Sequence, residues 1–249
     1  VKPSRIWEMR VGRSRAVITR SIPLPKSYDL EGIAVQPRGG WWVVSEGAGN
    51  AGGTGLTRNL LVRVNRDGSI AEEVQLPDEL NAHQRSSGYE GVAVTASGAQ
   101  VYVCIQREWA DDPAGRVKIG RYTPATGEWR FFHYPLDAPP AGGWVGLSEI
   151  TRINDTTFAV IERDNQSGAA ARVKRIYRFS TAGLTPAPAG SPLPLLQKTL
   201  VRDLLEQDEF RLEKAEGLAL LGPGSFFLVN DNDGAGETRT VRFRSRGGR

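Results

Sequence analysis

Hydrophobic positions in this chain fall into short β-rich runs that are bounded by turn residues. One set of apolar runs lies at 41–45, 101–105, 158–161 and 226–229. A turn signal comes just before each run: Gly39-Gly40, Ser97-Gly98, Asn154-Asp155 and Pro223-Gly224. Another short apolar run precedes each turn. Two β-rich runs joined by such a turn predict an antiparallel hairpin.

A short motif that contains a glutamate, here called the acidic phrase, opens each of these hairpins. Its copies span residues 29–34, 88–93, 146–151 and 214–219. The four copies carry Glu31, Glu90, Glu149 and Glu216, which lie 59, 59 and 67 residues apart. Each glutamate stands at or near the start of a short apolar run. Self-similarity at a nearly fixed period indicates a repeat architecture, in which each unit packs against its neighbours.

A third and a fourth run complete each period. The third contains an arginine, and the matching positions are Arg63, Arg121, Arg178 and Arg242, with Arg10 one period earlier. The fourth follows a turn, as at 70–76. One period therefore holds four antiparallel strands, and four-stranded units repeated radially make a β-propeller. We predict an all-β fold, a β-propeller of four-stranded antiparallel blades.

The phase of the repeat also predicts that the N-terminal blade is incomplete. There are five third-strand arginines but four acidic phrases, so the first blade lacks its opening hairpin. A six-bladed ring at this period would need about 350 residues. We therefore expect one propeller domain over residues 1–249, with five to six blades, as the C-terminal part of a longer chain. A Pro-rich segment and a stretch with helical spacing form an insertion at 185–210.

Composition excludes several classes of function. The net charge of +4 comes from scattered basic residues, which does not favour nucleic-acid binding. No stretch approaches the roughly 18 apolar residues that a membrane span needs. The single cysteine, Cys104, lies in an apolar run and is expected to be a buried, inert thiol. With only two histidines, His83 and His133, a histidine-rich metal site is excluded.

The repeat predicts that acidic side chains converge. First strands of propeller blades line the central channel, so the four repeated glutamates should surround one point. Loops after the second strands return to the same face and bring further polar residues, including Glu46 and Asn232. Clustered carboxylates favour a hard cation, above all Ca²⁺. The expected metal ligands are Glu31, Glu90, Glu149, Glu216, Asp164, Asp231 and Asp233. Alternatively, each glutamate accepts hydrogen bonds from backbone N–H groups of the next blade.

Two arginines fall at matching places near this acidic ring. Arg107 and Arg163 can each present a guanidinium to an anion such as phosphate or carboxylate, or can pair with the glutamates. No Gly-x-Ser-x-Gly motif is present, so a Ser-His-Asp hydrolase is not expected. The sequence favours metal-assisted hydrolysis of a small anionic ester with a carboxylate base. The catalytic candidates are Glu149, Glu162, Arg163 and Arg107.

Several stretches resemble the phytase-like family described as having "esterase-like activity of phytase". They are 29–32, 89–93, 158–165, 214–218 and 229–233, and the Ile161-Glu162-Arg163-Asp164-Asn165 stretch is among the most specific. The resemblance implies a propeller that hydrolyses phosphate or carboxylic esters. Members are usually exported, which implies a periplasmic or secreted location. The resemblance assigns no catalytic residue.

Two other functions remain open from the sequence. One is a non-catalytic propeller that binds a ligand or serves as a subunit of an assembly, with a protein partner at an open blade edge. The other is a lactonase-type propeller enzyme, which also uses acidic channel residues around one divalent ion. Hydrolysis of lactones but not of phosphate esters would distinguish the latter.

Overall fold

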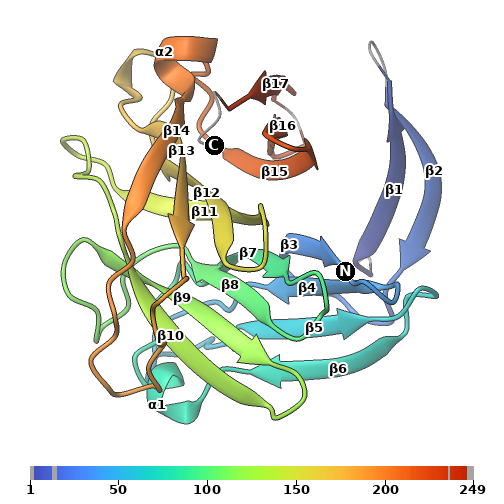
Figure 1. The fold of residues 1–249 in the computed structure, drawn as a ribbon, viewed down its shortest axis with the longest axis vertical. Helices are drawn as coiled ribbons and strands as arrows, with labels where there is room; N and C mark the ends of the chain where they lie inside the picture. Colours follow the sequence, from blue (N-terminus) through green and yellow to red (C-terminus); the bar gives the residue numbers. More distant parts are fainter. Residues whose placement is uncertain (1–2, 13–15, 235, 246–249) are drawn as a thin grey trace.

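The computed structural model describes residues 3–12, 16–234 and 236–245. These residues form seventeen β-strands, a short 3₁₀ turn (Gly168–Ala170) and the short helices α1 (Asp78–Asn81) and α2 (Leu204–Asp208). The strands belong to five antiparallel sheets, which follow one another around an arc (Figure 1). The predicted all-β propeller is therefore confirmed. Within the described ranges, no helix is long and apolar enough to cross a bilayer.

Three of the sheets are four-stranded blades whose strand order follows the chain order. The first contains β3 (Leu30–Val35), β4 (Trp41–Ser45), β5 (Leu60–Val64) and β6 (Ile70–Gln75). The second contains β7 (Tyr89–Val94), β8 (Val101–Ile105), β9 (Arg116–Thr123) and β10 (Glu128–Pro135). The third contains β11 (Val145–Arg152), β12 (Thr157–Asp164), β13 (Lys174–Ser180) and β14 (Lys198–Asp203).

The sheets at the two ends of the arc have fewer strands. The N-terminal sheet pairs β1 (Arg5–Val11) with β2 (Ala16–Pro23), and the last sheet contains β15 (Ala215–Gly222), β16 (Ser225–Asn230) and β17 (Thr240–Arg244). These two sheets face each other across the open part of the arc (Figure 1). The pair β1–β2 occupies the place of a third and a fourth blade strand, as the phase of the repeat predicted for Arg10.

The β1–β2 pair leaves apolar side chains exposed. Trp7 is 51% and Met9 56% exposed, and both lie on β1, which pairs among the described strands with β2 alone. In the complete blades, the corresponding third strand pairs on both sides. A protein partner at this open edge, expected from the sequence, stays a prediction.

The hydrophobic core lies between consecutive sheets. Trp42 and Leu61 of the first blade pack with Val92 and Val103 of the second, and similar clusters lie at each following boundary between sheets. The alternating apolar positions of the strands supply these layers, because successive side chains point to opposite faces of a sheet. Cys104 is fully buried in one such layer, and burial raises the pKa of its thiol well above the ordinary value. These layers fix the inner strands against one another.

The inner strands approach so closely that two glycines are needed at their contacts. A Cβ atom built on Gly32 would lie 2.7 Å from the Gly91 Cα, and one built on Gly91 would lie 2.5 Å from the Ile150 backbone nitrogen. Both distances are far inside van der Waals contact, and backbone atoms cannot rotate away. Gly32 and Gly91 therefore permit β3, β7 and β11 to pack side by side.

We expect Gly91→Ala to destabilise the protein by at least about 1–3 kcal/mol, the usual cost of overpacking. Gly222→Ala is the matched control, because a Cβ atom there meets no atom within 4 Å. Urea unfolding of both variants measures the difference. Equal stability of the two variants would show that β7 and β11 are less tightly packed than described.

The insertion at 185–210 differs from the sequence-based expectation. Helical spacing pointed to a helix through 195–206, but Lys198–Asp203 is strand β14 and the helix is confined to Leu204–Asp208. The reason is tertiary: β13 needs an outer partner, and its pairing with β14 outweighs weak local helix preference. The preceding Pro-rich segment runs along the edge of β10, where Phe131 and Ala187 exchange two backbone hydrogen bonds. This contact covers an otherwise open edge.

Candidate functional site at the mouth of the channel

Each inner strand begins with a β-bulge, and three of the four bulges carry a glutamate. In β3, Leu30 pairs with Ser45 and Gly32 with Val44, so Glu31 has no partner in the ladder. The equivalent unpaired residues are Glu90, Ser148 and Glu216. A bulge leaves one residue out of the pairing and redirects its side chain. The acidic phrase therefore encodes a bulge that carries a carboxylate.

Glu149 departs from the other three glutamates. It lies one residue later, at the position that Gly32 and Gly91 take in their strands, while Ser148 occupies the bulge. Its Oε1 accepts a hydrogen bond of 2.8 Å from the Ile150 N–H, and the Leu218 N–H of the next sheet also donates to its carboxyl. Burial is the main cause that raises its pKa well above the ordinary value. Glu149 therefore accepts hydrogen bonds from backbone N–H groups, which is the alternative to metal binding that the sequence left open for the repeated glutamates.

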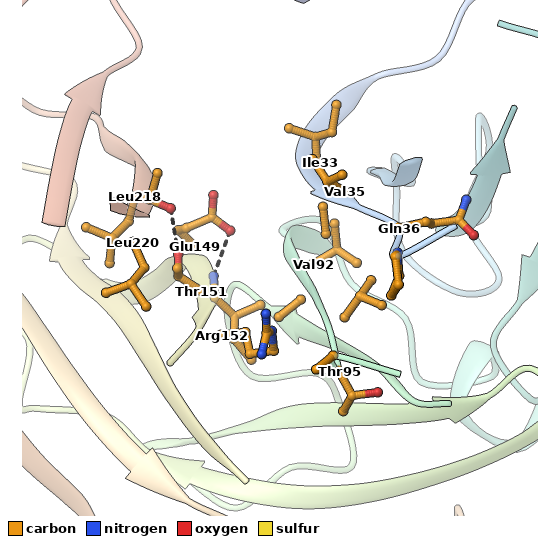
Figure 2. A pocket seen from close by; sticks show the side chains of 17 residues that line it. Ile33, Val35, Gln36, Val92, Thr95, Glu149, Thr151, Arg152, Leu218 and Leu220 are labelled. Atoms are coloured by element: carbon orange, nitrogen blue, oxygen red, sulfur yellow. Dashed lines mark hydrogen bonds between the residues drawn. The ribbon is translucent and has the colours of Figure 1, made fainter. Parts of the chain in front are cut away.

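Glu149 borders a cavity that the four inner strands line. The cavity has a volume of about 620 Å³ and is lined largely by apolar residues of β3, β7, β11 and β15. Figure 2 shows Glu149 beside Leu218, with Ile33 and Val92 across the space. Its carboxyl therefore borders the apolar stretch of the channel and also lies near the bulge glutamate Glu216, whose charge raises its pKa further.

The closest group of carboxylates joins Asp29, Glu31 and Glu46. One oxygen from each lies within 4.8 Å of the others, which is the separation expected of ligands to one metal ion. Burial, followed by the nearby charges of Glu46, Asp29 and Glu216, raises the pKa of Glu31 from 4.5 to about 8. Oxygen-only donors of this kind suit Ca²⁺. The chemistry of the donor set therefore fits a divalent hard cation.

Glu46 is held in place by the neighbouring blade. Its Oε1 accepts a hydrogen bond of 2.7 Å from the Gly88 N–H, at the start of the next acidic phrase. Burial is again the main cause that raises its pKa, although the Gly88 N–H opposes the shift. This contact with the next blade fixes the Glu46 carboxyl beside Asp29 and Glu31.

Glu90 and Glu216 extend this acidic group. Glu90 is 5% exposed and accepts a hydrogen bond from the Gln106 amide, and burial raises its pKa well above the ordinary value. Glu216 pairs with Arg163 at 2.8 Å, between Oε1 and Nη2. The charges of Glu31, Glu46 and Glu216 all raise the pKa of Glu90, so these groups share one neighbourhood. We call Asp29, Glu31, Glu46, Glu90 and Glu216 the acidic mouth.

Lys214 separates two further predicted ligands from the acidic mouth. Its Nζ lies 2.6 Å from Asp233 Oδ1 and 3.5 Å from Asp231 Oδ2. Its positive charge also partly offsets the rise in the pKa of Glu31 and of Glu216. Asp231 and Asp233 are exposed, and Lys214 neutralises part of their charge.

Arg107 and Arg163 lie against the same indole ring. Their guanidinium carbons are 5.0 Å and 5.1 Å from the centre of the Trp144 ring, within the range of cation–π contacts. Arg163 also pairs with Glu216, whereas Arg107 has no carboxylate partner among the described residues. The Nε atoms of both arginines are buried without a hydrogen-bond partner. Arg107 therefore remains available to an anion beside the acidic mouth.

Glu162 and Asp164 lie elsewhere. Glu162 faces the second blade, where it accepts hydrogen bonds from the Tyr134 hydroxyl at 2.9 Å and from Lys198 Nζ at 2.8 Å. Asp164 forms a fully buried pair with Lys174 at 2.8 Å. Burial opposes ionisation of Asp164, but Lys174 and two backbone N–H groups outweigh burial and lower its pKa. The oxygens of both carboxylates are thus already occupied, and neither belongs to the acidic mouth.

The structure brings together some of the residues predicted from the sequence and adds two. Glu31, Glu90 and Glu216 share the acidic mouth, and Arg163 joins them. Asp29 and Glu46 complete the candidate metal group, although neither was among the predicted ligands. A signal was present in the sequence, because Asp29 belongs to the first acidic phrase and Glu46 follows the second strand of the same hairpin.

The chain is similar to a known protein family and to solved structures. The sequence model of the phytase-like family, described as "esterase-like activity of phytase", matches residues 2–234. A solved structure titled "Structure of Dos1 propeller" is similar with a TM-score of 0.35 and 8% sequence identity, over 97% of this chain and 63% of that chain. This chain thus spans less than two thirds of the length of that structure. No curated protein matches the sequence.

Proposed function

The chain belongs to the phytase-like family, and from that membership we propose that it is a cation-dependent hydrolase of phosphate or carboxylic esters that acts at the acidic mouth. The observation that carries the proposal is the group formed by Asp29, Glu31 and Glu46, whose oxygens lie within 4.8 Å of one another. The proposal includes Ca²⁺ as the cation and a small anionic ester as the substrate. An extracytoplasmic location, periplasmic or secreted, is proposed from the family resemblance alone.

Different residues of the chain are proposed to bind the cation, to bind the substrate and to transfer a proton. Asp29, Glu31 and Glu46 would hold the cation, which when bound polarises the ester and the attacking water. Arg107 would bind the negative group of the substrate by charge-assisted hydrogen bonds. Arg163 orients Glu216 through their 2.8 Å pair and favours its ionised form, although burial raises the pKa of Glu216 overall.

Glu90 is the proposed proton-transfer group. It is almost fully buried, it accepts a hydrogen bond from the Gln106 amide, and its pKa is raised well above the ordinary range. A buried carboxyl with a raised pKa can exchange a proton with the attacking water and with the leaving alcohol. Glu149 and Glu162 are not included, because their oxygens are committed to other partners.

The pH dependence of stability tests the crowding of carboxylates at the mouth. The pKa of Glu31 is about 8 in the folded protein against an ordinary 4.5. The folded state therefore holds this proton more tightly than the unfolded state, and stability falls as pH rises between about 4.5 and 8. We expect the metal-free protein to melt at a lower temperature at pH 8 than at pH 6, and Glu31→Gln to reduce this difference. An unchanged difference in the variant would show that Glu31 does not titrate in this range.

An ester-hydrolysis assay tests the activity itself. We expect turnover of p-nitrophenyl phosphate or p-nitrophenyl acetate with Ca²⁺ and its loss in chelator. If the phosphate ester is the substrate, Arg107→Gln should lower kcat/KM by about tenfold or more, since a hydrogen bond to a charged group is lost. Arg116→Gln is the control, because Arg116 is exposed and is not among the residues of the acidic mouth. Absence of turnover of phosphate, acyl and lactone esters under every metal condition would reject the hydrolase.

A further inference from the structure

A second charged site lies between the third blade and the last sheet. A groove of about 1000 Å³ is lined by residues of β13, β14, β16 and β17 and of the adjoining turns. Three arginines line it: Arg178, Arg202 and Arg244. None of the described lining residues is acidic, so the groove carries a local excess of positive charge.

The groove lies at the opposite end of the sheets from the acidic mouth. In the ladder between β12 and β13, Arg163 at the mouth pairs with Lys174, whereas Phe158 at the far end pairs with Phe179, next to Arg178. In the last sheet, Arg244 pairs with Ser225, at the far end of β16. The groove and the acidic mouth share no lining residue, so a ligand in one does not occupy the other.

Two of the three arginines have no partner of opposite charge. Arg202 forms a bidentate pair with Asp208 at 2.6 Å and 2.8 Å and lies over the Phe243 ring. Arg178 and Arg244 have neither an ion pair nor a side-chain hydrogen bond among the described residues. The two unpaired guanidinium groups match the charge of one phosphate or phosphonate dianion.

Comparison with the first blade explains why Arg178 is unpaired. Arg63 occupies the same position of the repeat and pairs with Glu72, which lies directly opposite on the fourth strand, at 3.0 Å. The residue opposite Arg178 is Thr199. The repeat thus keeps the arginine in the third blade but omits the carboxylate that neutralises its counterpart.

The groove also offers an apolar surface beside the charges. Leu200 is 50% exposed, and Ile153, Val201 and Phe226 line the same space. A purely inorganic anion would leave this surface in contact with water. We propose that the groove binds a small organic phosphate or phosphonate, with its anionic group between Arg178 and Arg244 and its apolar body against Leu200.

Calorimetric titration with phenylphosphonate tests this proposal, because the probe carries both features and has no ester to hydrolyse. We expect saturable binding that weakens about tenfold or more in Arg178→Gln and in Arg244→Gln, because each loses a charge-assisted hydrogen bond. Arg116→Gln removes the same charge from an exposed strand position outside the groove and should bind as the wild type does.

Two further measurements separate the groove from the acidic mouth and test the apolar contact. Binding of the probe that persists in Arg107→Gln supports the groove, whereas binding lost in Arg107→Gln and kept in Arg178→Gln would overturn it and leave the proposed hydrolase intact. Inorganic phosphate should bind several-fold more weakly than phenylphosphonate, because it buries no apolar area. Equal affinities, or no saturable binding by the wild type, would overturn the proposal.

Discussion

Replacing Lys174 by methionine should lower the free energy of unfolding by about 3–5 kcal/mol, because one charge of a buried pair would be left without its partner. The side chains of Lys174 and Asp164 are both 0% exposed, and their charged atoms are 2.8 Å apart. Lys174 Nζ also donates to the backbone oxygens of Asp164 and Glu213. The substitution therefore removes three hydrogen bonds made by a buried ammonium group.

Lys26→Met is the matched control for this prediction. Lys26 pairs with Glu73 at 2.6 Å, but its side chain is 53% exposed. An exposed pair contributes about 0–1 kcal/mol. Urea unfolding, with the dependence on denaturant compared between variants, measures both effects. If Lys174→Met cost no more than Lys26→Met, Asp164 would not be a structural carboxylate and would return to consideration as a metal ligand.

The double substitution Glu31→Gln and Glu46→Gln should abolish stabilisation by Ca²⁺. A ligand that binds only the folded state at 100 times its Kd adds about 2.7 kcal/mol, or roughly 5–11 °C in melting temperature for a domain of this size. The variant keeps the shape of both side chains but removes two charges. Its metal-free form should also melt higher than the metal-free wild type at pH 8, because the repulsion between the carboxylates is relieved.

Glu72→Gln provides the control for the calcium effect. Glu72 lies on the fourth strand of the first blade and pairs with Arg63, away from the mouth. Thermal melts in Ca²⁺ and in chelator should show the full wild-type shift in this variant. The same calcium shift in the double variant and in the wild type would place the cation, if one binds, outside the group of Asp29, Glu31 and Glu46.

The fold could be predicted from the sequence because the repeat has several independent signals. Turn residues, an acidic phrase and a third-strand arginine recur together. Because they recur at similar offsets, any one of them predicts where the others lie in the period. The phase placed Arg10 on a third strand, and the structure gives that strand as β1. The stretch 195–206 could not be assigned in this way, because its short range of helical spacing does not reveal that β13 lacks an outer partner.

The candidate site was predicted less completely, for reasons of local geometry. Glu149 matched the glutamate spacing to within one residue, but a one-residue shift at a bulge turns a side chain to another face. In β12, strand alternation puts Glu162 and Arg163 on opposite faces, which a stricter use of the period of two would have shown. Asp29 and Glu46 face each other across the β3–β4 hairpin, where the Glu46 N–H donates to the Asp29 carbonyl, so the predicted hairpin register could have found this contact.

Calorimetric titration of Ca²⁺ at pH 7, repeated in two buffers of different ionisation enthalpy, tests the central claim most directly. We predict one ion bound per chain, with net release of protons, because carboxyls such as Glu31, with a pKa of about 8, must ionise to bind the cation. The heat should therefore differ between the two buffers. The absence of saturable binding, or binding with the same heat in both buffers, would contradict a cation site at the acidic mouth.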